Sequence, residues 1–254
     1  MPTIIDLSKL IEYKKNDPFY MKVKIKHKPH PKSKFLIRFI GLPKRLFPNG
    51  WPGWADDMIT QMGVHSTTHL DAPWHFGPTV NGEKAKTIDE VPLDWCYGEG
   101  IVLDMTHKED NDPITVQDVE ADLKKSGAQI KEGTIVLVRT DCDRFQGQAD
   151  FPAKGPGVTA DATEWLIDRG VRVMGIDQWG WDMPLKAQAE LAKETGNTEI
   201  FWEAHRVGTR KEYCHIEQLV NLKALPAHGF KVALFPLKIK GGSAAPARVV
   251  AIIE

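Results

Sequence analysis

The chain has 254 residues, of which 42% are hydrophobic and 26% charged, and 33 Lys and Arg nearly balance 34 Asp and Glu, for a formal net charge of −1. Such a chain buries a sizeable core, and its balanced charge excludes an overall attraction to nucleic acid or anionic lipid, so we expect neither nucleic acid nor a membrane as a partner. Because the N-terminal stretch lacks the apolar run and cleavage site of a secretory signal, and no later stretch approaches a membrane span, we expect a cytoplasmic protein.

The first predicted strand lies in residues 21–30 (MKVKIKHKPH). Alternation places Val23, Ile25 and His27 on one side and lysines on the other, which is typical of a solvated sheet edge. The stretch 63–76 (GVHSTTHLDAPWHF) contains Pro73 and the β-branched Thr67 and Thr68, which disfavour a helix. We therefore predict an extended or turning chain there.

Strand and helix patterns alternate from about residue 100 onward. We predict strands at 100–105, 134–141 and 171–179, with helices between them at about 116–126 and 159–170. Thr115 and Asp118 stand in capping-box spacing before the first helix, and Gly127 stands where it should stop. This βαβαβ order predicts a partly parallel sheet with helices on its faces.

Two apolar stretches near the C-terminus, 231–239 and 247–254, are separated by Gly241 and Gly242 and predict a closing antiparallel pair. We find no internal repeat and no long linker. The sequence therefore predicts a single α/β domain over residues 1–254, with a mixed central sheet or partly closed barrel and flanking helices. Cys96, Cys142 and Cys214 lack C-x-x-C spacing, which predicts buried thiols rather than disulfides or a thiolate zinc site.

The histidines of the 63–76 stretch form a pattern suited to metal binding. His65, His69, Asp71 and His75 all carry odd numbers, so in an extended chain they face the same way. His69 and Asp71 can meet on one cation, whereas His65 and His69 would be about 13 Å apart in a straight strand, so the chain must bend between them. Nitrogen and carboxylate ligands without thiolates suit a catalytic Zn²⁺, Mn²⁺ or Fe²⁺ site with an open position.

A second group of candidate ligands lies near the C-terminus. His205 and Glu217 are twelve residues apart, with Glu203 and His215 close by. The spacing alone does not choose among these side chains.

The stretch HSTTHLDAPWH resembles the HxGTHxDxPxH signature of the metal-dependent cyclase family, which includes bacterial kynurenine formamidases and isatin hydrolases. The segments VMGIDQWGWD, AHRVG, HIEQLVNL and APARVVAI extend the resemblance over most of the chain. The resemblance implies a swivelling β/β/α fold and a homo-oligomer, dimer or tetramer, whose neighbouring subunits help enclose each active site.

The same resemblance implies roles for particular residues. His65, His69 and Asp71 fall on metal-binding positions, His75 falls on the catalytic histidine, and His205 and Glu217 fall on positions that complete a second metal site or assist catalysis. Thr67 stands where the signature has glycine, which adds a β-branched side chain at a point where the chain must turn or approach another backbone closely.

Our hypothesis from these residues is a metal-dependent hydrolase of carbon–nitrogen bonds other than peptide bonds, with one or two Mn²⁺ or Zn²⁺ ions per subunit. A bound ion would activate water and polarise an amide carbonyl, and His75 would carry a proton to the leaving nitrogen. Glu217 would hold the ion or orient the water. A packing or ligand role for His75 remains the alternative.

Tryptophans beside these motifs suggest a flat aromatic wall for a planar substrate. The candidates are Trp54, Trp74, Trp179 and Trp181. This favours a small aryl amide, with an isatin-like lactam preferred over the formamide of N-formylkynurenine and a lactone less favoured. The alternative that these rings belong to the core or to an interface stays open.

Two other classes of protein share parts of the pattern. His69, Asp71 and a distant His205 also match the facial triad of non-haem iron oxygenases, but those enzymes usually have a strand-rich jelly roll. A non-catalytic metal-binding or sensing protein would need a closed coordination shell. Nucleotide-binding glycine loops and a GxSxG elbow are not found in the sequence.

Overall fold

The computed structural model describes residues 1–254, with the side chain of Arg38 left aside. It contains two compact units, one made of residues 1–10 and 64–254 and the other of residues 11–63. The prediction of one domain over residues 1–254 stays a prediction. Among the described residues, no helix combines the length and the apolar character needed to cross a membrane.

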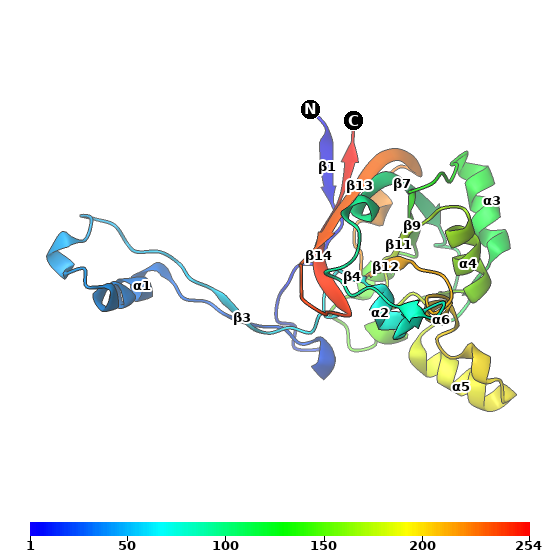
Figure 1. Cartoon of the computed structure of the whole chain (residues 1–254), viewed down its shortest axis with the longest axis horizontal. Coiled ribbons are helices and arrows are strands. Elements are labelled where there is room, and N and C mark those ends of the chain that lie inside the picture. Colours follow the sequence, from blue (N-terminus) through cyan, green and yellow to red (C-terminus); the bar gives the residue numbers. More distant parts are fainter. The chain divides into compact units, whose positions relative to one another are not determined.

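The larger unit is built on one eight-stranded mixed sheet (Figure 1). The strands, in their order across the sheet, are β1 (Thr3–Asp6), β14 (Ala244–Ile253), β13 (His228–Pro236), β7 (Tyr97–Asp104), β9 (Ile135–Arg139), β11 (Val173–Ile176), β12 (Cys214–Glu217) and β4 (His69–Asp71). A further pairing of β14 with β4 closes seven of these strands into a barrel and leaves β1 outside the ring. The mixed, barrel-like sheet agrees with the prediction.

The sheet contains both parallel and antiparallel strand pairs. The strands β7, β9, β11 and β12 run parallel to one another, and the remaining pairs are antiparallel. The parallel strands need crossovers, which are provided by α3 (Val116–Ser126), α4 (Ala160–Asp168) and the segment holding α5 (Leu185–Thr195) and α6 (Glu203–Val207). The predicted βαβαβ order and the closing antiparallel pair are confirmed; α5 was not predicted.

Smaller elements complete this unit. They are α2 (Pro73–Phe76), the paired β5 (Thr79–Val80) and β6 (Glu83–Lys84), the paired β8 (Pro113–Ile114) and β10 (Gly157–Val158), and 3₁₀ turns at Leu93–Cys96, Cys142–Phe145, Phe151–Ala153, Thr198–Ile200 and Leu222–Ala224.

Helix α3 begins and ends where its sequence predicts. The Asp118 backbone N–H donates to the Thr115 hydroxyl, and the Asp118 carboxylate accepts from the Thr115 backbone N–H, so the capping box is formed. Gly127 closes the helix at φ 73°, in the left-handed region that favours glycine. The three cysteines are free and buried, as predicted.

The core has two layers, one on each face of the strands. One apolar cluster takes side chains from all seven barrel strands and fills the interior, and a second lies between the parallel strands and helices α3, α4 and α6. On β9, Ile135 and Leu137 point inward while Val136 and Val138 face the helices. On β4 and β12, Leu70 and Ile216 belong to the interior cluster, so the neighbouring His69, Asp71, His215 and Glu217 face outward, toward the helical side.

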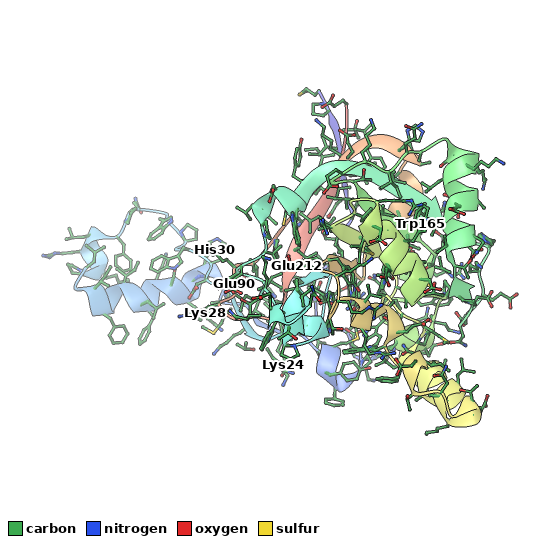
Figure 2. The ribbon with its side chains drawn as sticks, turned by 45° about the vertical axis from the view of Figure 1, so that its right-hand side comes forward. Lys24, Lys28, His30, Glu90, Trp165 and Glu212 are labelled. Carbon is green, nitrogen blue, oxygen red and sulfur yellow. The ribbon has the colours of Figure 1, made fainter. Side chains whose placement is uncertain are left out.

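The smaller unit is described by itself. It contains β2 (Lys24–Lys26) paired antiparallel with β3 (Met58–Gln61), α1 (His30–Ile37), and 3₁₀ turns at Phe19–Met21, Arg38–Ile40 and Lys44–Leu46. Val23 is buried while Lys24 is exposed, as the predicted alternation requires (Figure 2 labels Lys24). The strand is shorter than predicted and ends before His27, which is exposed.

Candidate metal centre

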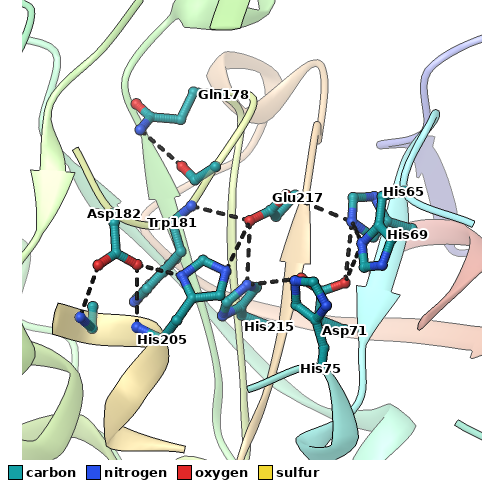
Figure 3. A network of polar contacts seen from close by, with 12 residues as sticks. His65, His69, Asp71, His75, Gln178, Trp181, Asp182, His205, His215 and Glu217 are labelled. Carbon is teal, nitrogen blue, oxygen red and sulfur yellow. Dashed lines mark hydrogen bonds and ion pairs between the residues drawn. The ribbon is translucent and has the colours of Figure 1, made fainter. Parts of the chain in front are cut away.

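The site begins with two short neighbouring strands. In the antiparallel pair β4–β12, His69 lies opposite Glu217 and Asp71 lies opposite His215. Because residues two apart on a strand share a face, this register places all four side chains together on the helical side of the barrel (Figure 3). Asp71, His69 and His215 are wholly buried.

His65 reaches the same place through a bend. Residues 64–68 turn before β4 begins, and the His65 Nδ1 lies 3.1 Å from the His69 Nε2 and 2.9 Å from the Asp71 Oδ1. The predicted bend between His65 and His69 is therefore present. The proposed extended alternation from His65 to His75 is wrong, because only His69–Asp71 is a strand and the remaining side chains converge by turning.

His75 comes from the single helical turn α2. Pro73 occupies one of the first positions of this turn, where its missing N–H costs nothing, so proline starts a helix here instead of preventing one. The prediction of a non-helical segment is wrong at this point. The His75 Nε2 lies 3.8 Å from the Asp71 Oδ2, and its ring centroid lies 4.3 Å from that of His65.

His205 enters from helix α6 on the other side of the cluster. Its Nε2 lies 3.8 Å from the Glu217 Oε1, and its Nδ1 contacts the Asp182 carboxylate. Asp182 also accepts hydrogen bonds from the backbone N–H groups of Ala204 (2.8 Å) and His205 (3.2 Å). The Trp181 backbone N–H donates to the Glu217 Oε1 over 3.2 Å.

Three histidines have one ring nitrogen committed outside the cluster. The His69 Nδ1–H donates to the Thr67 carbonyl over 2.7 Å, the His205 Nδ1–H donates to Asp182, and the His65 Nε2 lies 3.2 Å from the Ser243 hydroxyl. A carbonyl or carboxylate can only accept, so in the neutral ring of His69 or of His205 the other nitrogen presents a lone pair to the cluster. Outer hydrogen bonds of this kind fix the tautomer of metal-binding histidines.

Thr67 does not disturb this arrangement. Its side chain is buried, and its φ lies outside the left-handed region in which glycine would be required. Its carbonyl orients His69, so the departure from the family signature leaves the ligand geometry intact.

The fit to a cation rests on polar atoms that lack hydrogen bonds. Among the described residues, both carboxylate oxygens of Asp71 and both ring nitrogens of His215 are buried without a hydrogen-bond partner. Buried polar groups are normally paired, so such atoms need an explanation such as an ion. Two ligands at about 2.1 Å from one ion stand roughly 3.0–3.4 Å apart, and the distances among His65 Nδ1, His69 Nε2 and Asp71 Oδ1 are 2.9, 3.1 and 3.2 Å. The residues present fit a divalent ion.

Burial and the neighbouring charges shift the pKa values of the side chains in the cluster. Burial raises the pKa of Asp71, but the surrounding imidazoles outweigh burial and hold this pKa well below its usual range. Burial lowers the pKa of His215, but the carboxylates of Asp71 and Glu217 raise it to about 9. Burial lowers the pKa of His75 to about 4 despite the nearby Asp71 carboxylate, so this imidazole is neutral at pH 7. A cation among the ligands would take the place of the proton that His215 holds without it.

The predicted tryptophans have different surroundings. Trp181 is wholly buried, stacks on His215 with ring centroids 5.7 Å apart and donates its indole N–H to Thr163 over 2.9 Å, which favours the alternative that this ring belongs to the core. Its part in a flat aromatic wall stays a prediction. Trp74 is exposed next to His75, Trp179 is half-buried, and Trp54 lies in the smaller unit, stacked on Trp51. A substrate-binding role for Trp54, Trp74 and Trp179 stays a prediction.

Three residues of the site were not assigned from the sequence. His215 had a usable signal, because His215-Ile216-Glu217 repeats the spacing of His69-Leu70-Asp71 on a second strand. For Asp182 and Trp202, we found no signal in the sequence that points to the site. The Trp202 ring lies parallel to that of His205 with centroids 4.5 Å apart, and Trp202 adopts a φ of 56° that few non-glycine residues take.

The fold and this site define a mixed-barrel protein with a buried cluster of histidines and carboxylates. Residues 5–183 match the model of the Cyclase family ("Putative cyclase"), and the chain belongs to this family. The family resemblance inferred from the sequence is confirmed.

Similar proteins include an isatin hydrolase and a kynurenine formamidase. The isatin hydrolase of Roseibium aggregatum is 30% identical over 205 residues, which cover 76% of this chain and 73% of that protein. The kynurenine formamidase of Maricaulis maris is 29% identical over 221 residues, which cover 79% of this chain and 90% of that protein. The solved structure of isatin hydrolase A from Ralstonia solanacearum matches with a TM-score of 0.73 at 26% identity, covering 100% of this chain and 92% of that one. The predicted fold class is confirmed by this match.

Proposed function

We propose that this protein is a metal-dependent hydrolase that cleaves a carbon–nitrogen bond in a small aryl amide. The observation that carries the proposal is the Asp71 carboxylate, which is wholly buried, has no hydrogen-bond partner among the described residues and is approached by imidazole nitrogens of four histidines at 2.9 to 3.8 Å. Membership of the Cyclase family and similarity to an isatin hydrolase and a kynurenine formamidase support the same reaction class.

His65, His69 and Asp71 hold one divalent ion, and His205 and Glu217 contribute to a second ion or position the reacting water. The donor set of imidazoles and carboxylates, without thiolates, suits Mn²⁺ or Zn²⁺. When bound, the ion supplies Lewis acidity that lowers the pKa of a water from ~15.7 toward 7 and polarises the amide carbonyl.

His75 acts as the proton carrier. Its imidazole is 21% exposed, whereas the side chain of Asp71 next to it is wholly buried, so His75 has the access to reacting groups that Asp71 lacks. Its neutral form accepts a proton from the attacking water and passes it to the leaving nitrogen, which prevents expulsion of an amide anion.

The preferred substrate is an isatin-like cyclic amide. Trp74 and Trp179 provide aromatic surface near the signature motifs, and planar rings stack on such surfaces. The formamide of N-formylkynurenine is the alternative, supported by the relatives named kynurenine formamidase.

The protein acts as a cytoplasmic homo-oligomer and as one functional domain over residues 1–254. The smaller unit supports self-association, because it exposes many large apolar side chains, an arrangement that marks interaction surfaces. They are Phe19, Phe35, Phe39, Ile40, Leu46, Trp54, Met58 and Ile59.

The test is metal analysis of the purified protein coupled to hydrolysis assays on isatin, N-formylkynurenine and simple lactones. We expect a divalent ion, loss of hydrolysis after chelation and recovery on adding Mn²⁺ or Zn²⁺. Full activity without any metal contradicts the proposal, and oxygen consumption with 2-oxoglutarate would favour an iron oxygenase instead.

A further inference from the structure

The aromatic rings around His75 include an apolar one that is partly exposed. In the described part of the chain, four rings have centroids 4.3 to 6.0 Å from that of His75, and they belong to His65, Phe76, His205 and Trp202. Phe76 is buried, whereas Trp202 is partly exposed and lies 5.4 Å from His75 at an interplanar angle of 65°. Trp202 therefore offers apolar ring surface to a molecule that reaches His75.

Trp202 occupies this position in a strained backbone conformation. Its φ of 56° and ψ of 38° lie in the left-handed region, which glycine or asparagine would adopt at a lower cost. The Trp202 backbone N–H donates to the Gln188 Oε1 over 2.6 Å, and the Trp202 carbonyl accepts from the Arg206 backbone N–H over 2.9 Å, so contacts with α5 and α6 hold the conformation. Strain of this kind gathers at active sites and ligand sites. Because the backbone disfavours tryptophan here, we look to its side chain for the function.

The His205 ring fixes the orientation of the indole. The two rings are parallel within 2° with centroids 4.5 Å apart, and His205 is itself held by Asp182 (Figure 3 shows these two residues). One face of the indole is thus covered by an oriented ring. A rigid aromatic surface loses little conformational entropy when a ligand packs against its remaining area.

The chemistry of an aryl lactam brings its ring to this place. In an isatin-like lactam, the nitrogen that leaves on hydrolysis is bonded directly to the benzene ring. A proton carrier must come within hydrogen-bond reach of that nitrogen, so the benzene ring has to lie beside the carrier. With His75 as the carrier, Trp202 is the partly exposed apolar ring that such a substrate meets.

We propose that Trp202 is a specificity-determining residue whose indole packs against the aryl ring of the substrate beside His75. Two aromatic rings pack favourably, offset or edge to face, at centroid separations of about 4.5–7 Å. The inference rests on the proposed function and deepens it, because it assigns the selection of aryl over non-aryl amides to one residue of the site.

The first test compares two lactams that differ in the ring alone. Isatin and pyrrolidine-2,3-dione share the dicarbonyl lactam, and the second lacks the fused benzene ring. In the metal-containing protein, Trp202→Leu should lower the ratio of kcat/KM for isatin to that for pyrrolidine-2,3-dione by roughly 2- to 12-fold, the factor that aromatic packing contributes. Trp202→Phe should restore part of this ratio, and elemental analysis should find the same metal content in each variant.

Trp165 supplies the matched control. Its partly exposed ring on α4 packs against the Arg169 guanidinium, which lies 3.4 Å from the ring centroid (Figure 2 labels Trp165). Trp165→Leu therefore removes an indole of similar exposure from the same unit of the protein, and the ratio for the two lactams should stay that of the original chain.

Binding of two α-keto acids tests the same surface without hydrolysis. Phenylglyoxylate carries an aryl ring and pyruvate a methyl group on the same α-keto carboxylate. In calorimetric titration of the metal-containing protein, phenylglyoxylate should bind more tightly than pyruvate, and Trp202→Leu should reduce this preference by the same factor. A crystal structure of the original chain with phenylglyoxylate needs no variant, and its ring centroid should lie within about 7 Å of that of Trp202.

Several results would overturn the proposal. They are the absence of an aryl preference in the original chain, a preference that Trp202→Leu leaves unchanged with either pair, and a bound phenylglyoxylate whose ring lies away from Trp202. A lower metal content in Trp202→Leu with the aryl preference intact would also overturn it, because Trp202 would then only position His205.

The two pairs of compounds separate the inference from the function. A protein whose Trp202→Leu variant keeps the full preference for isatin refutes the role of Trp202 alone. A protein that hydrolyses neither lactam, but loses its preference for phenylglyoxylate in Trp202→Leu, refutes the proposed reaction alone.

Discussion

Asp182 offers the sharpest single perturbation, because it touches no proposed substrate and orients one ligand. Its carboxylate accepts from the backbone N–H groups of Ala204 and His205 and from the His205 Nδ1–H. In Asp182→Asn, one oxygen still accepts from Ala204 over 2.8 Å, but the amide group that replaces the Oδ2 is a donor facing two donors.

The substitution Asp182→Asn removes the contact that orients the His205 ring. Without an acceptor, the Nδ1–H no longer fixes the tautomer that presents the Nε2 lone pair toward Glu217. Removing an outer partner of this kind typically costs 10–100-fold in metal affinity, which corresponds to about 1.4–2.7 kcal/mol. We expect one bound ion to weaken by this factor and the ion held by His65 and His69 to keep its affinity.

The assay is calorimetric titration of chelator-treated Asp182→Asn with Zn²⁺, with thermal unfolding of the apo protein as the check on folding. Asp168→Asn is the matched control, because Asp168 is an exposed carboxylate paired with Lys211 on the surface. Wild-type affinities for every ion in Asp182→Asn, with Asp168→Asn unchanged, would refute the reasoning that this carboxylate orients a ligand.

Three further predictions concern the turnover of a His75 variant, the cap of helix α3 and the pH dependence of stability. His75→Ala should lower turnover by roughly 10²- to 10⁴-fold with metal content unchanged, as measured by steady-state kinetics and elemental analysis, whereas loss of an ion would reassign His75 as a ligand. Thr115→Ala removes the hydroxyl that caps α3 and should lower the free energy of unfolding by about 0.5–2 kcal/mol in urea denaturation; no change would contradict the importance of the capping box. Burial raises the pKa of Asp177 to about 7, so the folded chain keeps a proton that the unfolded chain loses near pH 4. The stabilising contribution of the protonated form is complete below about pH 4 and is lost as the pH rises through 7, by an amount on the order of 4 kcal/mol. Comparison of the pH dependence of unfolding with that of Asp177→Asn measures it, and equal slopes between pH 4 and 7 would contradict the shift.

Local signals predicted the parallel half of the barrel well. The strands around Ile101, Ile135 and Val173 are continuous apolar runs, which is typical of strands covered on both faces, and the cap at Thr115 and stop at Gly127 mark one helix between them. The three-residue strand β4 is too short to show a period of its own, and its place in the barrel depends on pairing with β12 and β14. Such pairings join residues more than 140 positions apart, so the local sequence pattern does not predict them.

For the candidate site too, one part could be predicted from the local sequence and another part could not. His65, His69, Asp71 and His75 crowd into one stretch of sequence, so their joint chemistry could be inferred before their geometry. The route by which they converge could not, because a turn at His65 and a helical turn opened by Pro73 replace the even alternation of a strand. Asp182 was missed since its role depends on a contact with His205 that arises only when α6 packs against the barrel.

The most direct measurement for the central claim is X-ray anomalous diffraction from crystals grown with Mn²⁺ or Zn²⁺, recorded on both sides of the metal absorption edge. The account predicts a peak in the anomalous map among the His65 Nδ1, the His69 Nε2 and the Asp71 carboxylate. Crystals saturated with the ion that show these side chains in place and no anomalous peak beside Asp71 would contradict it.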